Sequence, residues 1–266
     1  MTAIPLDVYG LILDSLAEDD EKLTSMRACS LVSRAFLPFA RKHIFASVEI
    51  GNPFATNPPP SIDAFVNLIE RNPEIAEYVR KFDYCIASHD HIMSPIPRTL
   101  GKLTKLKSLI IWHDSTNKLN WMTQMRPSLL HLMRLPTLSY LKLRWIENFP
   151  ISDLIHCSSL EHLQIAHVDF AEEDIVPPTI PLPPKLVHLR EYTVGPKSTS
   201  ATKKLLKSKR PDGLPIVNFT ELTKVTAICD KQEDIDTIQT VFIRAEHLEG
   251  IDLTSEFPLF NSEGRH

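Results

Sequence analysis

Glycine is scarce in this chain: only seven of the 266 residues are glycine, and no two of them lie within ten positions of each other. Phosphate cradles and dinucleotide-binding turns need glycine where the backbone approaches a ligand, so the shortage argues against both kinds of site. The chain contains no G-x-G, Walker or G-x-S-x-G sequence. Proline, in contrast, is abundant, with 21 residues, and stiffens the connecting segments.

Closely spaced cysteines, a cationic leader and long apolar runs are also missing. The four cysteines are too far apart for a C-x-x-C metal site or a compact disulfide framework, which indicates a reducing intracellular compartment, cytoplasm or nucleus. Without a signal peptide or an apolar run of about 18 residues, we expect no membrane partner. The formal net charge of -4 gives no general attraction to nucleic acid.

The first fifty residues have the apolar spacing of three short helices. Pro5 suits the start of the first helix, in which Val8, Leu11 and Ile12 share one face. A second helix should end near Val32, and a third should end near Phe45. We therefore predict a helical domain over residues 1–50, a proline-rich linker over 51–60 and a second domain over 61–266. Ser61 is the expected cap of the first helix in that second domain.

The second domain repeats a loose L-x-x-L-x-L pattern that is typical of leucine-rich repeats, in which L-x-L forms a short strand. The repeats follow one another at a variable spacing of about 22 to 36 residues. The aligned central residues are Phe82, Leu109, Leu141, Leu163, Leu189, Val225 and Ile251. We therefore predict an α+β chain: a three-helix module followed by an irregular α/β leucine-rich-repeat-like solenoid. Stacked repeats bury one another's apolar faces.

Two polar segments invite a chemical interpretation. The run from Ser88 to His91 alternates His, Asp and His, but no third ligand stands nearby, and we expect a solvated loop. The basic stretch from Lys197 to Arg210 is predicted as an inserted surface loop. A nuclear import signal and a patch for an acidic partner stay open as alternatives for this stretch. No nucleophile motif, metal set or cofactor site is predicted, so we expect a chain without catalytic residues and without a cofactor.

The amino-terminal segment resembles the F-box and F-box-like modules of the fungal type. That family begins with Leu-Pro, ends its second helix in Val-Cys-Arg-x-Trp and ends its third helix in an aromatic residue. Here Ile4-Pro5 stands at the start, Val32-Ser33-Arg34-Ala35-Phe36 ends the second helix, and Phe45 stands at the last position. Ser33 replaces the frequent Cys, and Phe36 replaces the frequent Trp. The resemblance covers about 45 of the 266 residues.

The resemblance implies a function in protein degradation: docking to a Skp-family adaptor, and through it to a cullin, in an SCF-type ubiquitin ligase. This chain would then be the substrate receptor, binding an unknown protein target through its repeats. The adaptor-binding candidates are Pro5, Leu6, Ile12, Leu31, Val32 and Phe36. Outward residues of the predicted strands are the target-binding candidates: Lys107, Lys142, Arg144, Glu161 and Gln164. The alternative is a repeat scaffold that binds a protein outside any ligase; a hydrolase or metal-dependent enzyme within the repeats is a third hypothesis.

Overall fold

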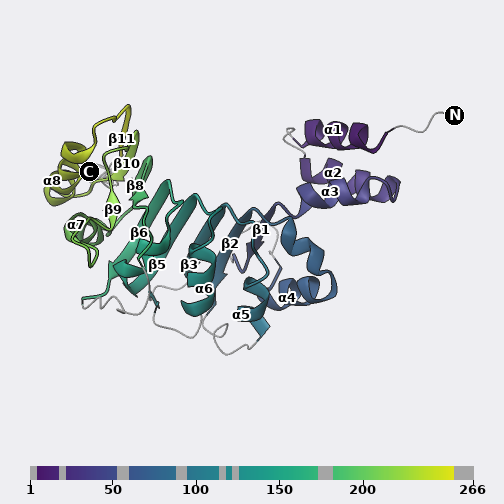
Figure 1. Cartoon of the computed structure of the whole chain (residues 1–266), viewed down its shortest axis with the longest axis horizontal. Helices are drawn as coiled ribbons and strands as arrows, with labels where there is room; N and C mark the ends of the chain where they lie inside the picture. The colour runs from purple at the N-terminus through teal and green to yellow at the C-terminus, as the bar shows by residue number, and fades with distance from the viewer. Residues whose placement is uncertain are drawn as a thin grey trace, which may run out of the picture. The chain divides into compact units, whose positions relative to one another are not determined.

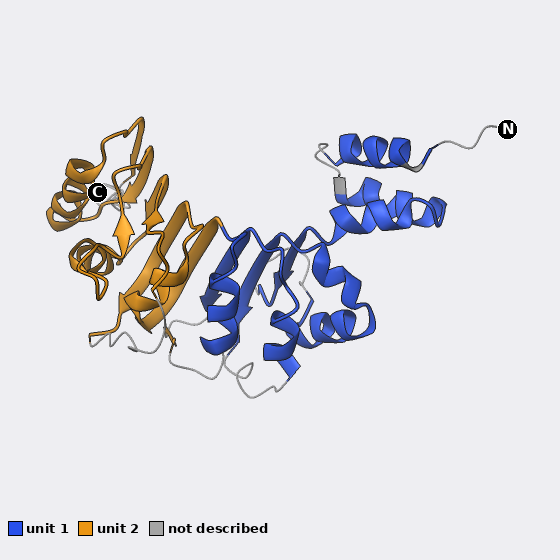
Figure 2. Ribbon diagram, in the orientation of Figure 1, with its two compact units in different colours: residues 1–114, 124–138 blue, residues 115–123, 139–266 orange. Residues whose placement is uncertain are grey.

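The structure, a computed structural model, describes residues 5–17, 22–52, 60–87, 95–113, 118–121, 126–172 and 182–254. The chain divides into two compact units (Figure 2). The first unit comprises residues 1–114 and 124–138, and the second comprises residues 115–123 and 139–266. Most of the predicted linker, residues 53–59, lies outside the described residues, so the boundary between the predicted domains stays a prediction.

Three helices open the first unit: α1 (Leu6–Leu16), α2 (Lys22–Val32) and α3 (Leu37–Ile44) (Figure 1). Their shared core is small, with Leu13, Met26 and Ala40 buried at its centre. Pro38 lies in the first turn of α3, where a missing N–H costs no helical hydrogen bond. Arg41 on α3 forms an ion pair with Glu74 at 3.2 Å, which links the helices to the segment before the second strand.

A parallel sheet follows in the first unit, formed by β1 (Ser47–Ile50), β2 (Lys81–Ile86) and β3 (Ser108–His113). The connecting helices are α4 (Ile62–Arg71), the 3-10 helix η1 (Pro73–Glu77), α5 (Pro95–Leu100) and α6 (Arg126–Met133). The Ser61 hydroxyl accepts a hydrogen bond from the Ala64 amide at 3.2 Å, which confirms the predicted cap of α4. Helix α5 contacts both α4 and α6, so the helices support one another as well as the sheet.

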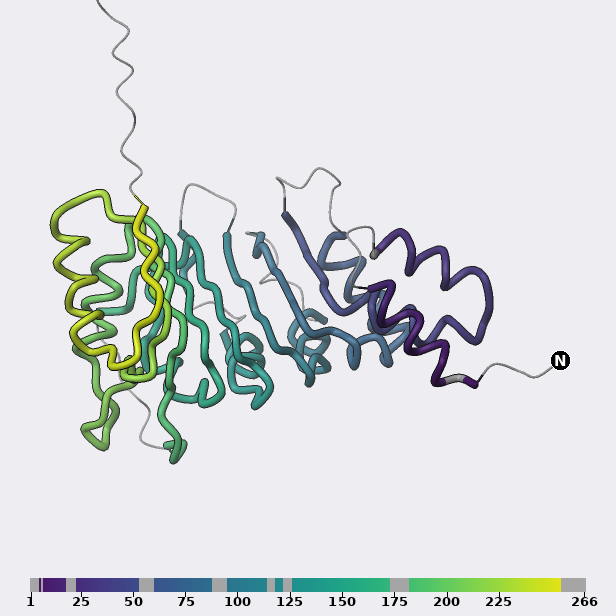
Figure 3. Tube along the Cα trace, turned by 90° about the horizontal axis from the view of Figure 1, so that it is seen from above, coloured from purple at the N-terminus to yellow at the C-terminus, as the bar shows by residue number. Residues whose placement is uncertain are grey.

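In the second unit, five parallel strands lie side by side (Figure 3). Their order is β5 (Tyr140–Phe149), β6 (His162–Phe170), β8 (Glu191–Val194), β10 (Lys224–Ile228) and β11 (Gly250–Thr254), and β4 (Leu119–Asn120) pairs with β5. Two short strands, β7 (Val187–His188) and β9 (Val217–Asn218), form a separate parallel pair. The helical connections are the 3-10 helix η3 (Ile151–His156), α7 (Thr199–Lys207) and α8 (Gln232–Arg244).

One apolar residue from each of four neighbouring strands forms a continuous buried row. Leu141, Leu163, Tyr192 and Val225 are partners in the sheet register, and each is at most 1% exposed. Tyr192 keeps its hydroxyl satisfied within the core by a 2.9 Å hydrogen bond with Thr202 of α7. Burial raises the pKa of the Tyr192 hydroxyl, so this group stays neutral.

The predicted fold class is wrong. Instead of a three-helix module followed by a leucine-rich-repeat-like solenoid, the strands form one nine-stranded sheet in the order β1-β2-β3-β5-β6-β8-β10-β11, with β4 beside β5. The described pairings in this sheet are parallel, and helices connect its strands, so the chain is α/β rather than α+β. Apolar periodicity locates strands, but it does not report how they pair. Strand β1 is too short to show a periodic pattern, so the sequence did not predict it.

Two local predictions also need correction. Tyr192, not Leu189, stands between Leu163 and Val225 in the register, because the apolar pattern before it forms β7 instead. The stretch from Lys197 to Arg210 is not a loop, since most of it forms α7, and Ala201, Thr202, Leu205 and Leu206 are buried there. The many lysines led to the loop prediction, although the stretch is an amphipathic helix whose apolar face packs on the core.

Gly195, which follows β8, lies where no side chain fits. A Cβ atom at this position would stand 2.6 Å from the Cβ atom of Ala166 on β6. The close approach allows the Gly195 amide to donate a 2.7 Å hydrogen bond to the Ile165 carbonyl. Gly195 therefore holds the end of β8 against β6.

We predict that Gly195→Ala lowers the free energy of unfolding by about 1 to 3 kcal/mol, because one strand must move away from the other. Denaturant unfolding of the purified chain measures this change. Gly101→Ala is the matched control, since its Cβ atom would meet only ordinary contacts at 3.5 Å and beyond. Equal stability of the two variants would contradict the prediction.

Candidate functional site

Large apolar side chains are exposed on the first two helices of the first unit. Leu31 is 86% exposed, Val32 is 74% exposed and Leu11 is 69% exposed. The complete set, called here the helical apolar surface, is Val8, Leu11 and Ile12 of α1 with Leu23, Leu31 and Val32 of α2. Exposed apolar side chains mark an interaction site where they form a contiguous patch, so this set is a candidate binding surface.

The predicted adaptor-binding residues do not all lie on this surface. Ile12, Leu31 and Val32 do, and Pro5 is also exposed. Phe36 is partly buried: it packs against the core of the three helices, and its ring centroid lies 4.7 Å from that of Tyr9. The side chain of Leu6 lies outside the described residues.

Sequence reasoning missed Val8, Leu11 and Leu23 as binding candidates and did not name Leu13 as core. The helical spacing of Val8, Leu11 and Ile12 was the available signal, but spacing does not tell whether a stripe faces inward or outward. Leu13 is fully buried and faces the core instead.

Polar contacts fix α1 against α3. The Asp14 carboxylate accepts hydrogen bonds from Lys42 at 3.1 Å and from the His43 ring at 2.7 Å. The hydrogen bond from Lys42, together with that from His43, holds the pKa of Asp14 below its ordinary value. The ion pair therefore orients α1, which carries half of the helical apolar surface.

The second candidate surface is the outward face of β5 and β6 in the second unit. Lys142 and Gln164 are register partners there, and Arg144 stands beside Ala166. Gln164 is fixed by a 2.8 Å hydrogen bond that it accepts from the Tyr140 hydroxyl. Three of the predicted target-binding residues thus lie together on neighbouring strands.

The two remaining target-binding candidates are placed differently. Glu161 precedes β6, and its backbone carbonyl accepts a hydrogen bond from the Arg190 amide at 2.8 Å. Lys107 precedes β3 in the first unit, where its amide donates to the Arg80 carbonyl at 2.7 Å. Both contacts are made by the backbone, and they place Glu161 just before β6 and Lys107 just before β3.

A pair of stacked rings on the same face was not predicted. The rings of Trp145 and His167 lie 3.8 Å apart between centroids and are nearly parallel, with an interplanar angle of 7°. Both residues have positive φ, 59° for Trp145 and 54° for His167, which is rare for such bulky residues. The only signal in the sequence is that each ring residue stands four positions after an aligned leucine, Leu141 or Leu163.

The His167 ring is held in its neutral form. Desolvation by burial lowers its pKa most, and the nearby charges of Lys197, Arg144 and Lys118 lower it further. The Nδ1 atom of the ring is buried and has no hydrogen-bond partner among the described residues.

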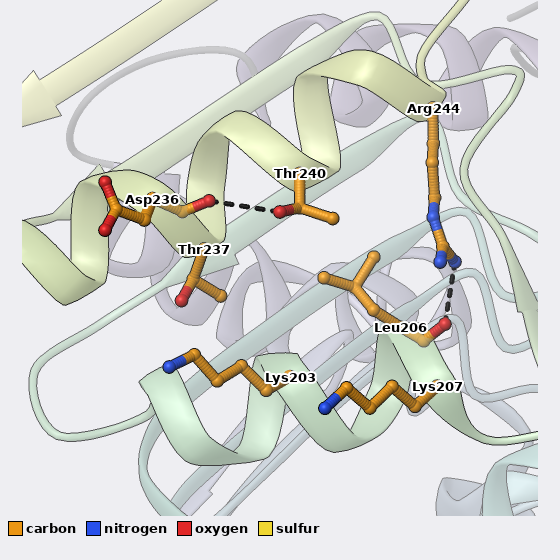
Figure 4. Close-up of a pocket in the computed structure, with 7 residues that line it drawn as sticks. All are labelled: Lys203, Leu206, Lys207, Asp236, Thr237, Thr240 and Arg244. Atoms are coloured by element: carbon orange, nitrogen blue, oxygen red, sulfur yellow. Dashed lines mark hydrogen bonds between the residues drawn. The ribbon is translucent and has the colours of Figure 1, made fainter.

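The basic helix α7 borders a cleft of about 330 Å³ that it shares with α8 (Figure 4). The polar side chains drawn there are largely satisfied locally: Thr240 donates to the Asp236 carbonyl at 3.1 Å, and Arg244 donates to the Leu206 carbonyl at 2.7 Å. Lys203 pairs with Glu233 on α8. Most of the polar side chains that line the cleft therefore already have partners among the described residues.

Two other basic residues of the same stretch are also engaged. The Lys204 ammonium donates to the Phe170 carbonyl at 3.0 Å. Arg210 is only 5% exposed and forms hydrogen bonds to the Pro183 carbonyl and to Asp212. A continuous, extended basic segment is therefore not presented here.

Metal and membrane sites gain no support from the described part of the chain. It contains no group of three or more His, Cys, Asp or Glu side chains suited to hold a metal ion. The run from Ser88 to His91 lies outside the described residues. Within the same described ranges, no helix has the length and apolar character required to span a bilayer.

Comparison of the sequence with known proteins returned no match, either to a family model or to a curated protein.

We predict that the His167 ring titrates below the ordinary histidine pKa of about 6.5. Because the folded state then binds fewer protons than the unfolded chain, His167 should reduce stability as the pH falls through about 6.5 toward its folded pKa. Histidine NMR resonances recorded against pH report this directly, with His167→Gln to assign the signal. A resonance that titrates at or above 6.5 would refute the prediction.

Proposed function

We propose that this chain is the substrate-recognition subunit of an SCF-type ubiquitin ligase and has no catalytic role of its own. The helical apolar surface would dock on a Skp-family adaptor, which connects to a cullin. The outward face of the sheet in the second unit would bind a protein target. The observation that carries the proposal is the exposure of six apolar side chains on α1 and α2.

The energetics are compatible with such docking. Full burial of an exposed apolar side chain contributes about 1.5 to 3 kcal/mol, so six of them contribute at most on the order of 10 kcal/mol, since Val8, Ile12 and Leu23 are only 38%, 44% and 46% exposed. Association costs roughly 4 to 15 kcal/mol, so affinity depends on most of the anchors being well fitted. Leu31 and Val32 are the most exposed of the set and stand to bury the largest areas.

The sequence resemblance adds a reason for choosing this partner. Val32 and Arg34 match the family pattern at the end of the second helix, and Phe36 keeps an aromatic residue where the family has Trp. In the structure the chain leaves α2 at Val32, and Phe36 packs back on the core. Phe36 would then position the end of α2, while Leu31 and Val32 contact the adaptor.

Val32→Asp should abolish co-purification of the full chain with a Skp-family adaptor, because the docked carboxylate would lose its water without gaining a partner. We expect affinity to fall at least about 100-fold, and thermal unfolding to stay unchanged since the side chain is 74% exposed. Ile243→Asp on α8, where the side chain is 84% exposed, is the matched control and should co-purify normally.

Retention of the adaptor by a folded Val32→Asp chain would eliminate the docking site. If the unsubstituted chain fails to bind any Skp-family adaptor, the ligase assignment is wrong, and a protein-binding scaffold outside a ligase becomes the better description. Leu31→Gln gives an independent reading of the same surface, since it removes an anchor without adding charge.

A further inference from the structure

Strands β5 and β6 depart from regular pairing at the same level. Arg144 pairs with Ala166 and Ile146 pairs with Val168, while Trp145 and His167 between them adopt positive φ. Such conformations cost of order 1 to 3 kcal/mol for residues other than glycine, and strain of this kind concentrates at functional sites. Both neighbouring strands therefore carry this conformational energy at the same level of the sheet.

The residues that follow β8 contact β6 at the same position along the strands. Gly195 lies against Ala166, and the Pro196 carbonyl accepts a hydrogen bond from the His167 amide at 2.9 Å. Lys197, the next residue, also has positive φ, at 54°. The strand-bulge site is defined here as Arg144, Trp145, His167 and Lys197.

Positive charge dominates the surroundings of the rings. Arg144, Lys197 and Lys118 all act on His167 from three different segments. Of these three, Lys118 is paired with Asp169 on β6. Glu147, on the same strand as Trp145, is the other carboxylate close by in sequence.

The two remaining cations have no such partner. Neither Arg144 nor Lys197 forms an ion pair or side-chain hydrogen bond within the part of the chain that the structure describes, and both are exposed. The Nδ1 atom of His167 is likewise unsatisfied there, although it is buried. Because this nitrogen is buried, the accessible donors of the site are the exposed side chains of Arg144 and Lys197.

We propose that the strand-bulge site binds an anionic group, a carboxylate or a phosphoryl group, carried by the protein target. Arg144 would bind the anion with two parallel hydrogen bonds, and Lys197 would contribute a point charge. The stacked pair Trp145 and His167 would form an apolar floor beneath the adjoining peptide. The inference rests on the proposed function for the claim that the ligand is a protein.

Bound anion would also change the proton balance of the site. Protonation of His167 is opposed by burial and by three cations. A negative charge placed among Arg144, Lys197 and the His167 ring offsets those cations, so protonation becomes easier when the ligand is present. Binding should therefore take up a proton and strengthen as the pH falls toward 6.

Several features favour a peptide over a nucleic acid. The formal net charge of the chain is -4, so the chain as a whole has no positive field that would attract nucleic acid. Single-stranded nucleic acid is bound on aromatic side chains that stack with successive bases. Here the rings of Trp145 and His167 stack on each other instead.

The test measures binding of acetylated hexaglutamate to the purified full chain by isothermal titration calorimetry, without any adaptor. We expect measurable affinity that weakens as salt rises, and at least tenfold weaker binding for Arg144→Gln and for Lys197→Gln. Arg134→Gln, an exposed arginine in the first unit, should leave affinity within twofold. The His167 resonance should titrate at higher pH when the peptide is bound.

Each further outcome decides one part of the proposal. Hexaglutamine must not bind, since equal binding would remove the role of charge. A phosphoserine peptide of the same length that binds more tightly assigns a phosphoryl group, and weaker binding assigns carboxylates. A single-stranded oligonucleotide that binds more tightly than either peptide would overturn the protein assignment. Absence of hexaglutamate and phosphoserine binding would refute the site while leaving adaptor docking intact.

Discussion

The register of parallel strands is the constraint on which the second unit depends. Leu141, Leu163, Tyr192 and Val225 become neighbours only in this register, and the resulting row is closed to water. A shift by one residue would turn each of these side chains to the opposite face. The hydrogen bond between Tyr192 and Thr202 anchors α7 to the same row, so the helix and the strands are held by one core.

The first three helices, in contrast, are constrained by the small size of their shared core. Their core has Leu13, Met26 and Ala40 buried at its centre with six partly buried apolar residues packed around them, and it leaves other apolar residues of α1 and α2 exposed. The apolar side chains that this core does not cover are exposed to solvent, and Leu31 and Val32 are the most exposed of them. Short helices gain most of their stability by packing an apolar face, and a partner would supply the packing that this segment lacks.

The outward face of the sheet carries a stacked ring pair where the backbones of β5 and β6 adopt positive φ, at Trp145 and His167. Regular pairing would alternate side chains evenly, whereas the positive φ at Trp145 and His167 brings their rings into parallel contact. Gly195 lies close to β6 at the same level, because any side chain there would collide with Ala166, the residue before His167.

The sequence by itself determined the local structure. Apolar spacing placed strands at Phe82, Leu109, Leu141 and Leu163, and Ser61 marked the start of a helix, because periodicity and capping act over a few residues. Only the tertiary structure decided that the strands other than β7 and β9 join one parallel sheet, and that the basic stretch folds as α7. The contact between Trp145 and His167 likewise depends on strands that are distant in sequence, and no local pattern encodes such pairing.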